Sequence, residues 1–227
     1  MRTGAPLPPG FRAAAWLLPA GQLLTIAATL LHTGGAANDH AAIFAAYAAS
    51  PSWIAVHLAQ FAGLSVFLAG LGSFFLACAA TGGRTQTLGC IGAGAAAGAF
   101  ALYGALQAVD GVALKHAVDA WAGAPEAEKA MRFAAAEAVR WLEWGLRSYC
   151  DFALGLALLL AAACAWRMDP LPRLLALPVT LAGLACLVQG WVAGANGFTP
   201  AQSAAIVAAW ALNLGWTTWL AVLARRA

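Results

Sequence analysis

Four histidines lie near the ends of the most apolar segments of the chain, namely His32, His40, His57 and His116. His32 ends the first apolar segment, and His57 lies about one helical turn inside the second. Because segments that follow one another in the chain usually pack together, these two imidazoles are expected to be neighbours. With His116, or with a carboxylate such as Asp110 or Glu137, they would supply three ligands to zinc, iron or copper.

A haem is an alternative to such a metal site. His32 with His57, or His57 with His116, could serve as axial ligands of a haem iron. The sequence contains no HxxxH, HExxH or CxxCH spacing, so the spacing alone does not force a metal site. His40, beside Asp39 in a stretch of small residues, is expected to be solvated.

Polar residues recur at helical spacing within several apolar segments. In the first segment Gln22, Thr25, Thr29 and His32 are three or four residues apart, which places them on one helical face. Polar side chains are costly inside a membrane, so such faces are expected to meet in a common interior. We expect this interior to form a ligand-binding cavity that opens to the extracytoplasmic side. The residues expected to line it are His57, Gln60, Tyr103, Gln107, Asp110, Glu137, Arg140, Trp144, Arg147, Asp151 and Asn213.

Charged residues within this set can pair with one another. Arg140 is three residues from both Glu137 and Glu143, and Arg147 is four residues from both Glu143 and Asp151. An isolated charge at the centre of a membrane span costs at least about 2.5–3.5 kcal/mol, so pairing is expected. Two interpretations stay open. The charges form a salt-bridge network that only joins helices, or one carboxylate is left over for a ligand, a proton or a metal ion.

Other kinds of catalytic site are not indicated by the sequence. There is no GxSxG motif for a nucleophilic serine. The five cysteines form no CxxC pair, and four of them lie in or beside apolar runs, where a free thiol behaves as a small hydrophobic group.

The composition identifies the setting in which these residues must be placed. The chain has 227 residues, of which 63% are hydrophobic and 9% are charged. Its mean hydropathy is +0.77. A soluble domain is about 45–50% apolar and about 25% charged, so the composition excludes a soluble enzyme, a disordered chain and a nucleic-acid-binding protein. A polytopic membrane protein remains.

The apolar segments predict an all-α bundle of six transmembrane helices, because about 20 apolar residues cross a bilayer as a helix. The whole chain, 1–227, is expected to form a single transmembrane domain. The spans are predicted at about 13–33, 53–80, 87–109, 140–166, 174–192 and 204–223. Pro125, followed by Glu126 and Glu128, predicts the start of a helix that continues through Trp141 into the fourth span. An additional extracytoplasmic helical segment is thus expected between spans three and four.

The distribution of basic residues predicts the orientation in the membrane. With a cytoplasmic N-terminus, the cytoplasmic side holds one acid, Asp169, and seven arginines: Arg2, Arg12, Arg84, Arg167, Arg173, Arg225 and Arg226. The other side carries five basic residues, all in the segment between spans three and four, and acids outnumber them there. This is a positive-inside pattern with both termini cytoplasmic.

Three sequence features together resemble small, uncharacterised bacterial multi-pass membrane proteins. They are Leu31-His32, the later turn from Trp53 to His57, and the run Arg140-Trp141-Leu142-Glu143-Trp144. The resemblance covers most of the chain. It implies location in the bacterial inner membrane, and it implies no activity.

Three classes of function fit these observations. The first is a protein that binds a small ligand, a transition metal or a haem in an outward-facing cavity, with or without catalysis. The second is a small-solute or proton-coupled transporter. The third is a non-catalytic subunit of a larger membrane complex, whose partners would be other membrane subunits as well as the lipid bilayer.

Overall fold

The computed structural model describes residues 9–169 and 171–226, and this part of the chain is helical with connecting turns. Within these residues, six helical segments are long and apolar enough to cross a membrane, which confirms the predicted number of candidate spans. The α-helices are α1 (Pro9–Leu30), α2 (His40–Ala48), α3 (Trp53–Ala79), α4 (Gly83–Gln107), α5 (Lys115–Ala122), α6 (Glu126–Arg167), α7 (Ala176–Asn196) and α8 (Pro200–Arg226). A π-helix (Ala108–Leu114) joins α4 to α5, and a short 3₁₀ turn (Arg173–Leu175) precedes α7.

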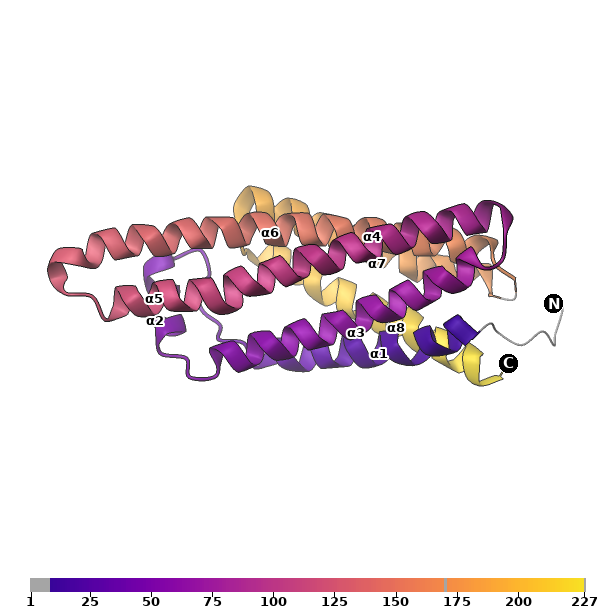
Figure 1. The fold of residues 1–227 in the computed structure, drawn as a ribbon, viewed down its shortest axis with the longest axis horizontal. Coiled ribbons are helices and arrows are strands. Elements are labelled where there is room, and N and C mark those ends of the chain that lie inside the picture. The colour runs from indigo at the N-terminus through magenta and orange to yellow at the C-terminus, as the bar shows by residue number, and fades with distance from the viewer. Residues whose placement is uncertain (1–8, 170, 227) are drawn as a thin grey trace.

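The long helices run roughly along one axis, and the beginning of α1 and the end of α8 lie at the same end of the bundle (Figure 1). We call this the terminal end and the other the distal end. Helix α1 packs chiefly on α3, and α6 packs chiefly on α7. A large apolar core fills much of the bundle and includes Phe67, Phe74, Leu158, Trp216 and Leu220.

Two long helical rods extend past the other helices at the distal end (Figure 1). One is continuous from α4 through the π-helix into α5, and the other is the beginning of α6. Helix α6 has 42 residues, which is about 63 Å and about twice the thickness of a bilayer core. Its N-cap is Pro125 and its first helical residue is Glu126, which is within one residue of the predicted start. The additional helical segment between spans three and four is therefore confirmed as helix.

Helix α2 is absent from the sequence-based prediction, which treated this stretch as a loop of small residues. The carboxylate of Asp39 accepts a hydrogen bond from the backbone N–H of Ala42 and so caps the helix. The buried face of α2 carries Ile43, Phe44 and Tyr47. This face packs in one apolar cluster with Trp53 of α3, so α2 lies over the distal end of the bundle.

The prediction that His40 is solvated is wrong. Its side chain is only 9% exposed, and its Nδ1 lies 2.9 Å from Oε1 of Glu137. The ring also stacks on Phe44. Because His40 is the first residue of α2, the capping that starts the helix also places this histidine against α6.

Glycines allow α1 and α3 to approach closely. A Cβ added at Gly21 would lie 2.3 Å from the backbone nitrogen of Phe67, and one added at Gly63 would lie 2.6 Å from that of Thr25. Small residues are the usual means of close helix packing in membranes. Since His32 follows α1 and His57 lies on α3, this close contact helps to bring the two histidines together.

Candidate metal centre

Three potential metal ligands meet at the distal end of the bundle. They are His32, directly after α1, His57 on α3 and Asp110 in the π-helix. Each residue offers one ligand atom, and these three atoms all lie within 4.8 Å of one another. The His57 side chain is 3% exposed and that of Asp110 is 15% exposed, so the group is largely shielded from water.

A backbone hydrogen bond fixes the orientation and the tautomer of His57. Its Nδ1 lies 2.8 Å from the carbonyl oxygen of Trp53, which can only accept, so Nδ1 carries a proton and donates it. Metal-binding histidines usually hold their second ring nitrogen in this way. The other nitrogen, Nε2, is thereby directed away from the backbone of α3 and toward Asp110.

The contact between His57 and Asp110 requires a cation. Nε2 of His57 is 3.1 Å from Oδ2 of Asp110, and neither this nitrogen nor Oδ1 has a hydrogen-bond partner within the described residues. In a neutral imidazole protonated on Nδ1, Nε2 presents a lone pair, which the carboxylate repels. Either a second proton on His57 or a metal ion shared by the two side chains removes this repulsion.

The π-helix is the local feature that positions Asp110. Its wider turn interrupts the regular α-helical pattern, and Nε1 of Trp53 donates a hydrogen bond of 3.2 Å to the backbone carbonyl of Asp110. Short π-helical segments are frequent at functional sites. Trp53 therefore holds both sides of the site, since its carbonyl orients His57 and its indole fixes the backbone of Asp110.

His32 lies beside this pair, within a group of aromatic rings. Its ring centroid is 5.0 Å from that of His57 and 4.9 Å from that of Trp53. The neutral form of imidazole is the form that binds metals.

Gly111 offers a test of how closely the π-helix approaches α3. A Cβ added at this position would lie 2.7 Å from Cβ of His57, so Gly111→Ala must displace His57 or the backbone that carries Asp110. We expect this change, which removes no ligand atom, to weaken zinc binding by about tenfold or more, the effect typical of disturbing the groups that orient metal ligands. A competition titration against a fluorescent zinc chelator measures the affinity.

Gly104→Ala is the matched control for Gly111→Ala. Gly104 lies on the same rod, and a Cβ there would make only an ordinary contact of 3.7 Å with Phe61. We expect this control to bind zinc like the unmodified protein. Equal affinities for all three proteins would show that the approach of the π-helix to His57 does not shape the site.

His32 and Asp110 lie on the wall of a cavity of about 230 Å³ at the distal end, and His57 contacts Asp110. Arg140 and Glu143 of α6 also line this cavity and form a buried ion pair. Arg140 also donates a hydrogen bond of 3.1 Å to the carbonyl of Ala37, and its guanidinium lies 4.6 Å from the ring centroid of Phe198. The lining of the cavity thus includes two of the three candidate metal ligands and a fixed cationic group.

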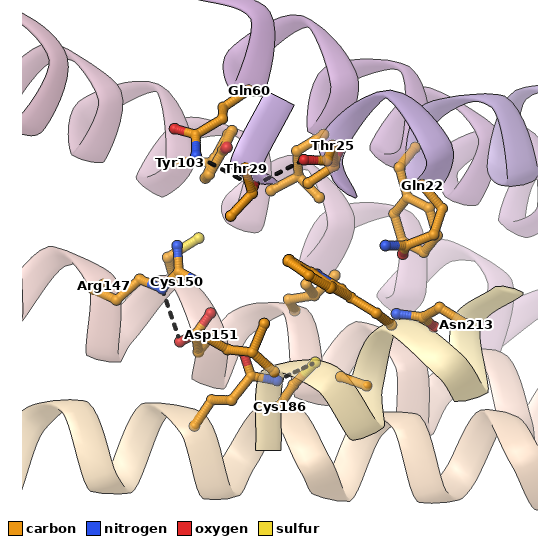
Figure 2. A pocket seen from close by; sticks show the side chains of 17 residues that line it. Gln22, Thr25, Thr29, Gln60, Tyr103, Arg147, Cys150, Asp151, Cys186 and Asn213 are labelled. Carbon is orange, nitrogen blue, oxygen red and sulfur yellow. Dashed lines mark hydrogen bonds and ion pairs between the residues drawn. The ribbon is translucent and has the colours of Figure 1, made fainter. Parts of the chain in front are cut away.

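A second pocket of about 100 Å³ continues from this cavity toward the middle of the bundle. The two share Thr29, Gln60, Arg147 and Ile206. Figure 2 shows Arg147 and Asp151 of α6 on one side of this pocket and Gln60 and Tyr103 on the other. Arg147 Nε lies 3.2 Å from Asp151 Oδ2. Beyond the pocket, the terminal half of the bundle is filled by the apolar core.

The structure brings most of the predicted site residues to these two cavities. His57 contacts Asp110, which lines the distal cavity. Lining residues of one or both cavities are Gln60, Tyr103, Gln107, Asp110, Arg140, Arg147, Asp151 and Asn213. Glu137 instead contacts His40, and Trp144 packs against Trp141 and Phe198, so neither lines a cavity. His116 is exposed on α5 and lies outside the metal-ligand group.

Several residues of the distal cavity lie outside the predicted lining, among them Glu143 and Tyr47. Glu143 had been considered only as an ion-pair partner, and Tyr47 belongs to the unpredicted helix α2. The position of Asp39 before an alanine-rich run is the sequence signal that could have revealed α2.

The geometry fits an ion better than a haem. A metal–imidazole bond is about 2 Å long, so two axial histidines on opposite faces of a porphyrin keep their ring centroids well beyond 5 Å apart. The centroids of His32 and His57 are 5.0 Å apart. His116 is exposed on α5 and is not a member of the group that contains His57, so the structure gives no support to the second predicted haem pair.

No protein-family model, curated protein or solved structure matches this chain, and the residues of the site are therefore the basis for any assignment of function.

Proposed function

We propose that this multi-span membrane protein binds a transition metal ion, with zinc the best fit, through His32, His57 and Asp110. The observation that carries the proposal is the orientation of His57. Its Nδ1 is committed to the Trp53 carbonyl, and its Nε2 lies 3.1 Å from a carboxylate oxygen of Asp110. When two ligand atoms each lie about 2.0–2.2 Å from a tetrahedral zinc ion, the distance between the two atoms is only slightly longer than the 3.1 Å observed here.

The ion pairs of the cavity support the choice of Asp110 as the ligand. Arg140 pairs with Glu143, and Arg147 pairs with Asp151. Asp110 has no such contact with either arginine within the described residues and faces two imidazoles instead. Of the two interpretations that the sequence left open, this arrangement favours a carboxylate left over for a cation.

A third ligand favours a metal ion over a proton shared between His57 and Asp110. A proton needs only one donor and one acceptor, whereas His32 adds a further ligand atom within 4.8 Å of the other two. Three protein ligands leave one position of a tetrahedral zinc ion open, which is the arrangement of catalytic rather than structural zinc sites. Because His32 and Asp110 line the distal cavity, a small molecule in that cavity would be close enough to occupy the open position.

We further propose that the distal end is extracytoplasmic, in a bacterial inner membrane. Six of the seven arginines predicted on the cytoplasmic side belong to helix ends or turns at the terminal end, namely Arg12, Arg84, Arg167, Arg173, Arg225 and Arg226. The seventh, Arg2, lies outside the described residues. Positive charges mark the cytoplasmic side of membrane proteins. The metal ion and its small ligand would then enter from outside the cytoplasm.

The metal content of the full chain tests the proposed function. The protein is purified in detergent, stripped with a chelator, reloaded with zinc and analysed by inductively coupled plasma mass spectrometry. We expect one tightly held zinc ion per chain, and the same content in His116→Ala, because His116 lies outside the ligand group. A chain that holds no zinc after reloading would overturn the proposal and favour a proton shared between His57 and Asp110.

A further inference from the structure

A group of three sulfur atoms is buried at the opposite, terminal end of the bundle. It consists of Cys78 near the end of α3, Cys164 near the end of α6, and Met168 directly after α6. The Cys78 thiol donates to the Met168 sulfur at 3.5 Å, and the Cys164 thiol lies beside that of Cys78. Cys78 and Cys164 are fully buried, and Met168 is 4% exposed.

The fold, and not the local sequence, creates this group. Cys78 and Met168 are 90 residues apart, so their contact depends on the packing of the chain around the end of α6. All three residues belong to the large apolar core. The sulfur atoms therefore face one another in a dry environment, away from the polar cavities of the distal end.

We propose that Cys78, Cys164 and Met168 form a binding site for a monovalent copper ion. Thiolate and thioether sulfur are the soft ligands that select Cu(I). Zinc sites, in contrast, are completed by histidine, cysteine, carboxylate or water, and methionine is not among their usual ligands. The combination of two thiols with a thioether is thus a donor set for copper.

The separation of the Cys78 and Met168 sulfur atoms is close to that expected around a three-coordinate ion. Three sulfur atoms placed about 2.3 Å from a central metal in one plane are about 4 Å from one another. The sulfur atoms of Cys78 and Met168 are 3.5 Å apart, so an outward movement of a few tenths of an ångström would admit the ion. Methionine, with three rotatable side-chain bonds, accommodates such a movement readily.

The charges balance when the two thiols lose their protons. Binding of Cu(I) to two thiolates and one thioether releases two protons and leaves the complex with one negative charge. Arg167 follows Cys164 by three residues on α6 and carries the opposite charge. Its guanidinium makes no ion pair with an acid among the described residues, and it donates only to the carbonyl of Ala163.

Competition with a chromogenic Cu(I) chelator tests this site. The full chain, reduced and kept under nitrogen in detergent, is titrated into the copper complex of bicinchoninate, whose colour is lost as copper is transferred. We expect the chain to remove one Cu(I). We also expect Cys78→Ser and Cys164→Ser to weaken the affinity by at least about tenfold, as befits the loss of direct ligands.

Matched variants separate a copper site from a role in packing. Met168→Leu conserves volume and hydrophobicity, so it should retain the fold while lowering the affinity for Cu(I). Cys90→Ser, at an exposed position, and Cys186→Ser, buried elsewhere, should bind copper like the unmodified chain. The proposal would be overturned if both Met168→Leu and the double variant Cys78→Ser, Cys164→Ser kept the copper affinity of the unmodified chain. It would also be overturned if the unmodified chain failed to take Cu(I) from bicinchoninate.

The outcome is independent of the proposed function at the distal end. His57→Ala should leave the transfer of Cu(I) unchanged, because none of the three sulfur atoms contributes to the group of His32, His57 and Asp110. Loss of copper binding in His57→Ala but not in Cys78→Ser would place the copper at the distal site and contradict the proposal.

Discussion

Replacing His57 by alanine is expected to abolish high-affinity zinc binding while the six long helices stay folded. The substitution removes the ligand whose orientation is fixed by the Trp53 carbonyl. It leaves only His32 and Asp110 of the three ligands. Since disturbing even the groups around a metal ligand costs 10- to 100-fold in affinity, we expect loss of the ligand itself to cost more than about 100-fold. Competition with a zinc chelator measures the affinity, and circular dichroism monitors the helices.

A second variant separates metal binding from packing. Asp110→Asn nearly preserves the shape of the side chain but removes the negative charge, so it should also lose zinc while filling the same space. His116→Ala is the control, because this histidine is exposed on α5. Zinc affinity that remains unchanged in both His57→Ala and Asp110→Asn would show that the ion is held elsewhere.

Replacing Arg140 by methionine is expected to be among the most destabilising single changes in the distal half. Arg140 is 1% exposed and Glu143 is 3% exposed, and the two form a direct ion pair. The variant leaves the Glu143 carboxylate buried without its partner. Removing one member of a buried ion pair typically costs about 3–5 kcal/mol. The loss is measured as a lower unfolding temperature and a lower free energy of unfolding in detergent.

Two further variants distinguish this explanation from a general effect of losing an arginine. Arg140→Met combined with Glu143→Gln removes both charges and should recover much of the lost stability. Arg132→Met is the matched control, because its ion pair with Glu128 has side-chain exposures of 47% and 43%. An exposed pair contributes about 0–1 kcal/mol, so this control should change stability little. An effect of Arg132→Met as large as that of Arg140→Met would contradict the account.

The membrane architecture was predictable because each span depends on its own residues. About 20 consecutive apolar residues are enough to predict a spanning helix, whatever its neighbours are. The helix starting after Pro125 was predictable for the same reason, since Pro125 and the two glutamates that follow are local signals. Helix α2 was missed because its alanine-rich sequence is short, and its stability depends on packing Ile43, Phe44 and Tyr47 against other elements.

The candidate metal site was predictable only in part, because it depends on contacts between distant segments. The approach of His32 to His57 follows from their places at the ends of consecutive spans. The choice of Asp110 as the third ligand depends on the π-helix, which shifts the helical register and directs the side chain toward α3. The sequence contains no feature from which a π-helix was expected, so Asp110, Glu137 and His116 could not be distinguished beforehand.

The coordination of zinc in the reloaded protein tests the central claim most directly. The X-ray absorption spectrum at the zinc edge reports both the type of ligand atom and its distance. We expect two imidazole nitrogens and carboxylate or water oxygen at about 2.0–2.2 Å from the zinc ion, with the signal of two imidazoles lost in His57→Ala. A spectrum of tightly held zinc without imidazole, or with sulfur at about 2.3 Å, would contradict a metal centre formed by His32, His57 and Asp110.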